Sequence, residues 1–535
     1  MGEKTASAAS NGAGGQSGRG PMRGTVDRVG EVPRPAVRVL PWWAYTLSAA
    51  VAVALMGLAV WWLLAEAGGD AKLRIEAIRT GLTVGLGAGG AFALLINARR
   101  QWLQERAHNH QTAVNAAAEH DAAERRITEL YNAAAEQLGS DKAPVRLTAL
   151  YTLERLADDN ERHRQTIVNI ICAYLRMPFT PPAAAGPEEE HRERARRSAA
   201  RYRAARQGRP EPAQPLPGPD PHEELQVRLT AQRLLHTHLQ PDAAVHWGEI
   251  SLDLTGATLT NFTLTGCRLN TADFSSTTFT RNAWFNQATF TGNAVFSEAI
   301  FTGNAWFNKA TFTGNAVFSK ATFTGNARFN QATFTGDAWF SEATFTGDAR
   351  FDEATFTRTA VFSEATFTGD AGFDKATFTG DAWFSVATFT GNAGFSKATF
   401  TRDAVFSEAT FTGDARFDKA TFTRTAEFSK ATFTETARFD KATFTRTAGF
   451  HKATFTETAG FDEATFTGDA WFSVATFTGN AGFSKATFSR GVDLEAATVA
   501  DVRLVHQIPA GWEIQPVGGT GGRFVQAGTS PSSGS

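Results

Sequence analysis

Large and small apolar residues recur at fixed intervals between Leu254 and Phe488. Leu or Phe first stands at every fifth position, and the Phe spacing then alternates between six and five, with an alanine two residues before each Phe of the alternating part. Residues two apart in an extended chain point to the same side. Thr and Phe favour strands, and the abundant Thr and Gly are poor helix formers. The pattern therefore predicts a β-solenoid with Phe and Ala inside and Thr, Asn, Asp, Ser and Lys outside.

The residue that follows each Phe reveals a longer period. Asn or Asp stands at one set of positions and Ser at the interleaved set, with members of each set spaced in multiples of 22, as for Asn286, Asn308 and Asn330 against Ser297 and Ser319. The two halves of this period are thus not equivalent. We expect one four-sided coil of about 22 residues, and about twelve coils in all.

The residue that precedes each Phe sorts in the same way. One set is mixed and contains Trp, Arg and Gly, whereas the other is mostly apolar. When coils of this period are stacked, the apolar set forms an exterior stripe, which is the candidate interaction site: Val295, Val317, Trp339, Val361, Trp383, Val405 and Trp471. Duplication of the chain in blocks of one coil could also have created this sorting.

Two apolar stretches near the N-terminus are expected to be transmembrane helices. Residues 41–65 carry no charge and are long enough to span the ~30 Å hydrocarbon layer, with Trp pairs at both ends. A second stretch, residues 78–97, places Gly81, Gly85 and Gly89 on one helix face, a spacing that lets membrane helices pack closely. Basic residues before the first stretch and after the second favour a multi-pass protein of the cell membrane with its N-terminus and repeats in the cytoplasm.

The remaining segments complete the predicted organisation of the chain. Leu and Ile at helical spacing follow the second apolar stretch, then a Pro- and Arg-rich stretch, and a short helix that would cap the solenoid. The predicted segments are a disordered tail at 1–38, two transmembrane helices at 39–98, an α-helical region at 99–177, a linker at 178–222, a capping helix at 223–249, the β-solenoid with its C-terminal cap at 250–506 and a disordered tail at 507–535.

Composition restricts the functional classes. The chain has 535 residues and a net charge of −2, which argues against a strongly basic nucleic-acid binder, and Phe, at 44 residues, is used far more than Tyr, at 5. The two cysteines, Cys172 and Cys267, exclude a disulfide framework, and both are expected to be buried. No nucleophile–base pair, phosphate loop or metal cluster is recognisable, so we expect neither catalysis nor a cofactor or metal.

The repeats resemble the pentapeptide-repeat family. The residues that carry the resemblance are 256–260 (Gly-Ala-Thr-Leu-Thr), 272–276 (Ala-Asp-Phe-Ser-Ser) and the Ala-x-Phe units through Phe488. The resemblance implies a right-handed quadrilateral β-helix, in which the central Phe or Leu and the preceding Ala fill the interior. The extra residue in every 11 departs from the family's strict period of five. The helical segment before the repeats is similar to that of membrane-anchored pentapeptide proteins of actinobacteria.

Three hypotheses about function follow. The first is a non-enzymatic, membrane-anchored scaffold that binds an unknown protein partner, or a second copy as a homodimer, through the apolar stripe. The second is DNA mimicry toward an enzyme such as gyrase, which the resemblance allows, although the nearly balanced charges of residues 281–490 argue against it. The third is ice or crystal binding through outward Thr arrays, which the strand propensity of Thr explains equally well. Direct binding of nucleic acid is not expected.

Overall fold

The computed structural model describes residues 41–182 and 220–528 except Ala67 and Asp70, together with Ala195 and Ala199. The chain divides into two compact units, Met1–His120 and Asp121–Ser535. The predicted N-terminal tail, most of the predicted linker and the end of the chain after residue 528 lie outside the described residues.

The first unit contains α1 (Trp42–Glu66) and the larger part of α2 (Ala71–Leu138). Both helices include segments long and apolar enough to cross a membrane. Two of the three predicted contact glycines lie against α1: a Cβ on Gly81 would meet Val60 Cγ2 at 2.7 Å, and one on Gly85 would meet Met56 Sδ at 3.1 Å. Gly89, by contrast, has open space around it. The helix predicted directly after the second apolar stretch is the continuation of α2 to Leu138.

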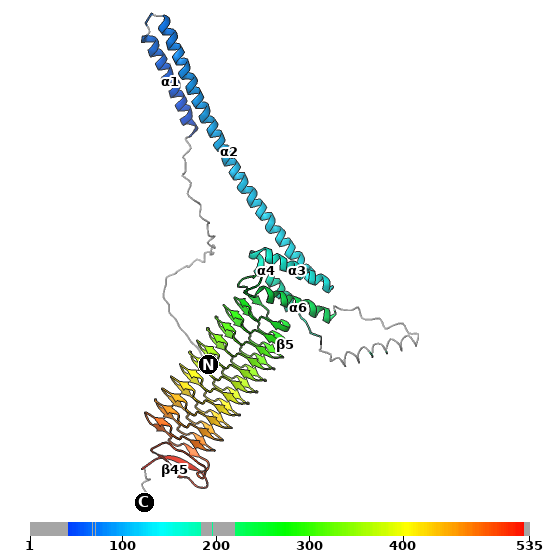
Figure 1. The fold of residues 1–535 in the computed structure, drawn as a ribbon, viewed down its shortest axis with the longest axis vertical. Helices are drawn as coiled ribbons and strands as arrows, with labels where there is room; N and C mark the ends of the chain where they lie inside the picture. Colours follow the sequence, from blue (N-terminus) through cyan, green and yellow to red (C-terminus); the bar gives the residue numbers. More distant parts are fainter. Residues whose placement is uncertain are drawn as a thin grey trace, which may run out of the picture. The chain divides into compact units, whose positions relative to one another are not determined.

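The second unit is a four-sided β-solenoid with helices at one end (Figure 1). In one coil, β6 (Thr289–Phe290), β7 (Ala294–Val295), β8 (Ile300–Phe301) and β9 (Ala305–Trp306) follow one another around the four sides. Each strand pairs in parallel with the strand one coil further on, as Ala316 pairs with Ala338. Residues in contact across neighbouring coils, such as Asn304 and Asn326, stand 22 positions apart. The predicted period is therefore confirmed, and β7 belongs to a 12-stranded sheet.

We name the four sides by their outward residues. The 12-stranded sheet of β7 is the Val/Trp side, the column of strands that contains β9 is the Arg/Gly side, and the columns of β6 and β8 are the two Thr/Phe sides. A Thr/Phe side separates the Val/Trp side from the Arg/Gly side in both directions around the coil. The Val/Trp and Arg/Gly sides consequently face away from each other.

The first coils are shorter than the rest. β1 (Leu252–Asp253) pairs with β4 (Ala272–Asp273), with Leu252 in register with Ala272, whereas β4 pairs with β7 in the longer register of Ala272 with Ala294. β2 (Thr258–Thr263) pairs with β5 (Thr278–Trp284) across a register shift between Thr260 and Phe262. The register shift thus accommodates the change from a five-residue to a six/five-residue pattern.

Phe rings fill the interior. Phe373 is fully buried. Its ring stacks on the ring of Phe395, with the centroids 4.8 Å apart and an angle of 1° between the ring planes. It meets the ring of Phe384 edge to face, with the centroids 5.4 Å apart and an interplanar angle of 89°. The same two contacts recur along the solenoid, and the Ala residues beside them are also buried. Each buried Phe contributes roughly 1.5–3 kcal/mol from burial, with an additional contribution from ring contacts. The Phe ladder is therefore the continuous core.

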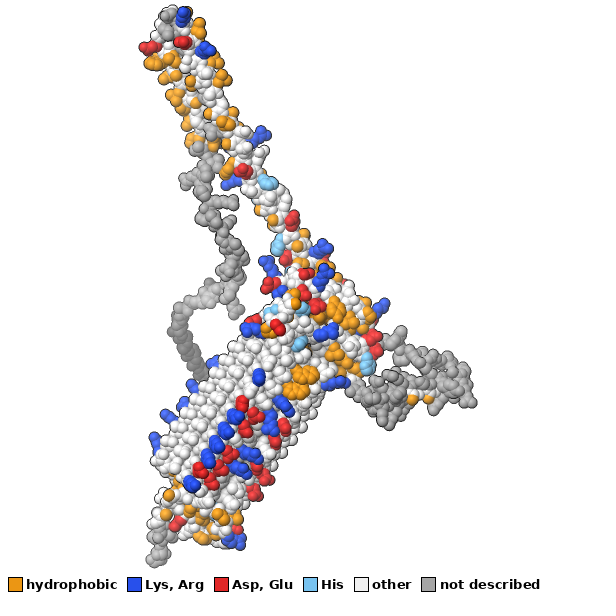
Figure 2. Space-filling view, in the orientation of Figure 1, with side chains coloured by type: hydrophobic (Ala, Val, Ile, Leu, Met, Phe, Trp, Pro, Cys, Tyr) orange, Lys and Arg blue, Asp and Glu red, His pale blue; other side chains and the backbone are white. Residues whose placement is uncertain are grey.

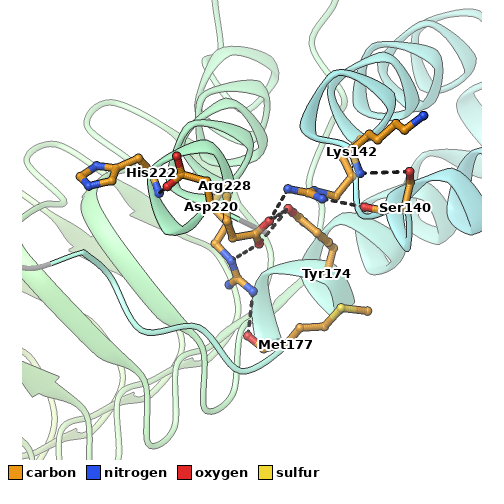
Figure 3. A network of polar contacts seen from close by, with 9 residues as sticks. Ser140, Lys142, Tyr174, Met177, Asp220, His222 and Arg228 are labelled. Atoms are coloured by element: carbon orange, nitrogen blue, oxygen red, sulfur yellow. Dashed lines mark hydrogen bonds and ion pairs between the residues drawn. The ribbon is translucent and has the colours of Figure 1, made fainter. Parts of the chain in front are cut away.

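Helices cover the first coils. α4 (Arg164–Arg176) and α6 (Pro221–His238) pack on β1 and β2, and α3 (Ala143–Asp159) packs on both helices. The Glu224 carboxylate accepts hydrogen bonds from the Tyr174 hydroxyl at 2.9 Å and from Arg228 Nε at 2.7 Å (Figure 3). Arg228 also donates to the Leu175 and Met177 carbonyls at 2.8 Å each, at the end of α4. This buried network joins α4 and α6 into one cap.

The far end of the solenoid differs from the prediction. In place of a disordered tail from residue 507, β45 (Trp512–Pro516) and β46 (Gly522–Gln526) form an antiparallel hairpin, and β46 pairs with β44 (Thr498–Val499). Phe524 is buried and lies 5.9 Å from the Phe477 ring. The hairpin thus closes the end of the Phe ladder and protects the edge of β44.

Candidate functional site

The structure places the whole predicted stripe on the Val/Trp side. The outward residue of each strand in this sheet stands directly above that of the strand one coil away. The register gives one continuous column: Val295, Val317, Trp339, Val361, Trp383, Val405, Glu427, Gly449 and Trp471.

The tryptophans of this column are its most exposed members. Trp339 and Trp383 are each 45% exposed and Trp471 is 50% exposed, whereas the four valines are half-buried. An indole exposed on a sheet presents a large apolar surface and one N–H donor, features that are enriched where proteins bind one another. The tryptophans therefore project further from the sheet than the valines between them.

Glu427 and Gly449 interrupt the column. A Cβ at Gly449 would lie 2.6 Å from Glu427 Oε2, so the missing side chain makes room for this carboxylate. Glu427 also accepts a hydrogen bond from the backbone N–H of Ser429 at 3.1 Å. The interruption separates a longer apolar segment, Val295–Val405, from the isolated Trp471.

Two further exposed valines extend the site beyond the predicted residues. Val386 is 51% exposed and Val474 is 42% exposed, and each stands three residues after a stripe tryptophan, Trp383 and Trp471. Both lie in the turn that leaves the Val/Trp side. The signal was present in the repeated sequence Trp-Phe-Ser-Val, where the other coils have Glu or Lys at the last position.

On the face shown in Figure 2, many charged side chains of the solenoid form a band along the rod. Arg350 and Arg416 project from the Arg/Gly side, and Asp carboxylates lie at the corners beside them. The Thr/Phe sides carry the predicted outward Thr arrays, in which Thr311 pairs with Thr333. The sides thus differ in chemistry: one is apolar, one is charged and two are lined with hydroxyl groups.

The buried titratable groups have structural surroundings. Burial raises the pKa of the Cys172 thiol to about 12, and Cys267, also buried, accepts a hydrogen bond from Gln240 at 3.3 Å. Burial and the Glu224 carboxylate together raise the pKa of Tyr174 above its ordinary value. Among the described residues, no three His, Cys, Asp or Glu side chains are grouped so that they could hold a metal ion.

Comparison with known proteins bears on the solenoid alone. Neither the curated proteins nor the solved structures gave a match. Residues 254–498, from 254–300 in the first copy to 450–498 in the last, match the family model described as pentapeptide repeats in 9 overlapping copies. This interval coincides with the Phe ladder and its Ala neighbours. The four-sided solenoid of this chain is therefore a pentapeptide-repeat domain.

Proposed function

We propose that this protein is a membrane-anchored, non-enzymatic scaffold and that its Val/Trp side binds a protein partner. The exposure of three in-register tryptophans on one rigid sheet is the observation that carries the proposal. Exposed tryptophans are unusual on a surface that consists largely of Thr, Ser, Asn and charged residues, and Trp is enriched among the residues that contribute most to binding energy at interfaces.

The architecture supports a scaffold role. Each coil is fixed to its neighbours by backbone pairing and by the Phe ladder, so the distances between the tryptophans are set in advance and little ordering is needed on binding. Trp339 and Trp383 lie two coils apart, about 10 Å at the strand spacing. A partner with apolar pockets at that spacing would engage both indoles.

The anchoring part of the proposal rests on α1 and the apolar part of α2. Both segments have no buried residues within their apolar windows, as expected of helices whose surroundings are lipid. In the proposed arrangement the two helices lie in the cell membrane, and the N-terminus and the repeats lie in the cytoplasm.

The test replaces the anchors in the full-length chain. We expect W339S/W383S/W471S to reduce partner recovery at least about tenfold, because each lost Trp anchor costs about 1–3 kcal/mol. A photo-crosslinking residue at Val361 should label the partner in native membranes, and prior W339S/W383S/W471S substitution should abolish the labelling.

The matched control is I300S, which removes an apolar side chain of similar exposure, 42%, from a Thr/Phe side. It should leave partner recovery unchanged. Recovery and labelling that survive the triple substitution would show that the partner binds elsewhere. A label that joins two copies of the chain would show that the stripe serves self-association instead.

A further inference from the structure

The outward residues of the Arg/Gly side form a second ordered column. Parallel register stacks these residues one coil apart from β5 to β41 (Ala481–Gly482). Along the chain, each residue type occupies two successive coils before the type changes: Trp284, Trp306, Arg328, Arg350, Gly372, Gly394, Arg416, Arg438, Gly460 and Gly482.

When this order of residues is read backwards and set against itself in one register, each Arg stands opposite a Gly. When a second copy lies antiparallel, with the twofold axis between Gly394 and Arg416, every arginine of one copy faces a glycine of the other. Successive coils repeat at 4.8 Å in both copies, so one register satisfies all of these contacts. The facing residues are Arg328 with Gly482, Arg350 with Gly460, Arg416 with Gly394 and Arg438 with Gly372.

We propose that two copies of this chain pair antiparallel through their Arg/Gly sides, with the arginines of each copy inserted over the glycines of the other. Such an interface is isologous, because the same surface serves both copies.

A carboxylate lies beside each receiving glycine. A Cβ on Gly394 would lie 3.0 Å from Asp374 Oδ1, one on Gly460 would lie 2.9 Å from Asp440 Oδ1, and one on Gly482 would lie 3.3 Å from Asp462 Oδ1. At Gly372 the corresponding atom is Asp352 Oδ1, at 2.7 Å. Each glycine therefore leaves a notch with an acidic rim, which suits a guanidinium group from the second copy.

Two of these arginines also have carboxylate partners within their own copy. Arg350 lies 3.6 Å from Asp370 and 3.8 Å from Asp348, and Arg416 lies 3.3 Å from Asp414. Burial, together with the next carboxylate in the column, raises the pKa values of Asp352 and Asp440. The antiparallel register brings the two Asp columns toward each other, and the inserted guanidinium groups are the cations that lie between them.

Arg350 requires one adjustment. Its side chain leans over Gly372 of its own copy, where a Cβ would lie 3.1 Å from Arg350 Nη1. A rotation of this side chain toward Gly460 of the second copy would free the Gly372 notch for Arg438. No change of the backbone is required.

The ends of the column also match. At the start of the Arg/Gly side, the rings of Trp284 and Trp306 stack with their centroids 5.4 Å apart and an angle of 12° between the ring planes. At its other end Gln507 pairs with Gly482, and the residues just before Gln507 include Leu504 and Val505, which are 38% and 73% exposed. The antiparallel register directs the tryptophans of one copy toward this apolar end of the other.

The inference is independent of the partner site. The Val/Trp side faces away from the Arg/Gly side, so a dimer of this kind leaves both apolar stripes accessible. Loss of partner binding in W339S/W383S/W471S and loss of pairing through the Arg/Gly side are consequently separate outcomes.

The decisive experiment is an exchange of residues across the twofold axis. Full-length protein in detergent micelles is compared by sedimentation velocity and light scattering as wild type, G394R and the double variant G394R/R416G. G394R places Arg opposite Arg416 and should raise the dimer dissociation constant at least about 100-fold. The double variant has the composition and charge of the wild type, restores Arg opposite Gly, and should dimerise as the wild type does.

Folding of these variants is expected, because Arg occupies the same position at Arg416 and Arg438, and circular dichroism checks it. A monomeric wild type, a dimeric G394R or a double variant that stays monomeric would each overturn the proposal.

Crosslinking tests the direction of pairing. The register places Asn330 opposite Ser484 of the second copy, whereas within one chain these residues lie seven coils apart, about 34 Å. A short bismaleimide should convert N330C/S484C into a covalent dimer and leave N330C alone monomeric; the native cysteines are buried. Efficient dimerisation of N330C alone would indicate parallel copies and contradict the proposed register.

Discussion

Val386 and Val474 occupy a backbone conformation that L-residues rarely adopt. Each coil has two turns whose third residue has a φ near +60°, and these two valines fill that position with φ values of 60°. The Ala387 N–H donates to the Phe384 carbonyl at 3.2 Å and closes the turn around Val386, as in a type II turn. A β-branched residue is strained at positive φ, and the pairing of the coils on both sides holds it there.

Replacing Val386 by glycine should therefore stabilise the solenoid. Glycine removes the left-handed penalty of about 1–2 kcal/mol, part of which is offset by the greater freedom of glycine in the unfolded chain, so we expect a net gain of about 0.5–1 kcal/mol. Thermal unfolding of V386G measures it. V405G, in an extended strand of the same side, is the control and should lower stability; a loss in V386G as well would show that the turn is not strained.

The interior could be predicted residue by residue, but the turns could not. Phe and Ala two apart point to one side of any extended chain, so their burial follows from spacing alone. A turn with positive φ normally shows Gly or Asn, whereas Lys309, Glu353 and Val386 fill it here. The strain is imposed by the stacking of coils, which no local pattern contains.

Columns of Asn and Asp form the next level of organisation. The backbone N–H of Asn308 donates to Asn286 Oδ1 at 3.1 Å, and the N–H of Asp374 donates to Asp352 Oδ1 at 3.1 Å, so each side chain caps the same residue one coil on. The sorting of Asn and Asp revealed the period of the coil in the sequence. Its cause, a ladder of side-chain hydrogen bonds at the corners, becomes visible only when the coils are stacked.

Asp in such a column has an electrostatic cost that Asn avoids. Burial, and next the Asp440 carboxylate, raise the pKa of Asp418. The folded protein thus binds this proton more tightly than the unfolded chain, so stability decreases as pH rises through the raised pKa. We expect D418N to raise the melting temperature at neutral pH, and this gain should vanish as pH falls below the ordinary pKa of Asp.

The pH dependence distinguishes this effect from general stabilisation by amides. E364Q, which neutralises an exposed carboxylate in another column, should change the melting temperature little at any pH. An equal gain for D418N at acidic and neutral pH would contradict the electrostatic explanation.

The terminal hairpin shows where element prediction failed. Trp512, Ile514 and Phe524 alternate with polar residues as strand residues do, but Gly511, Gly518 and Gly519 nearby favoured a flexible tail. All three glycines adopt positive φ at the ends of the strands. The strands are fixed by pairing with β44 and by burial of Phe524 on the Phe ladder, contacts that depend on the completed solenoid.

The whole solenoid is quasi-one-dimensional, because each coil contacts only its neighbours. Its two ends are closed differently: α4 and α6 cover the first coils through several polar and apolar contacts, whereas the last Phe rings are covered by a final coil with the smaller Leu494 and Val499 and by one hairpin with one buried ring, Phe524. Local opening should therefore begin at the C-terminal end and spread one coil at a time.

F524D tests this polarity. Burying a carboxylate in place of the ring should cost about 3–5 kcal/mol locally and release the hairpin from Phe477. Hydrogen exchange should then quicken in the coils after residue 455 and stay slow in the coils before residue 400. R523D, which changes the exposed neighbour on the same strand, should leave exchange unchanged. Uniform acceleration along the solenoid would mean that it unfolds as one cooperative block, and that its terminal coils owe their stability to the whole Phe ladder rather than to the hairpin.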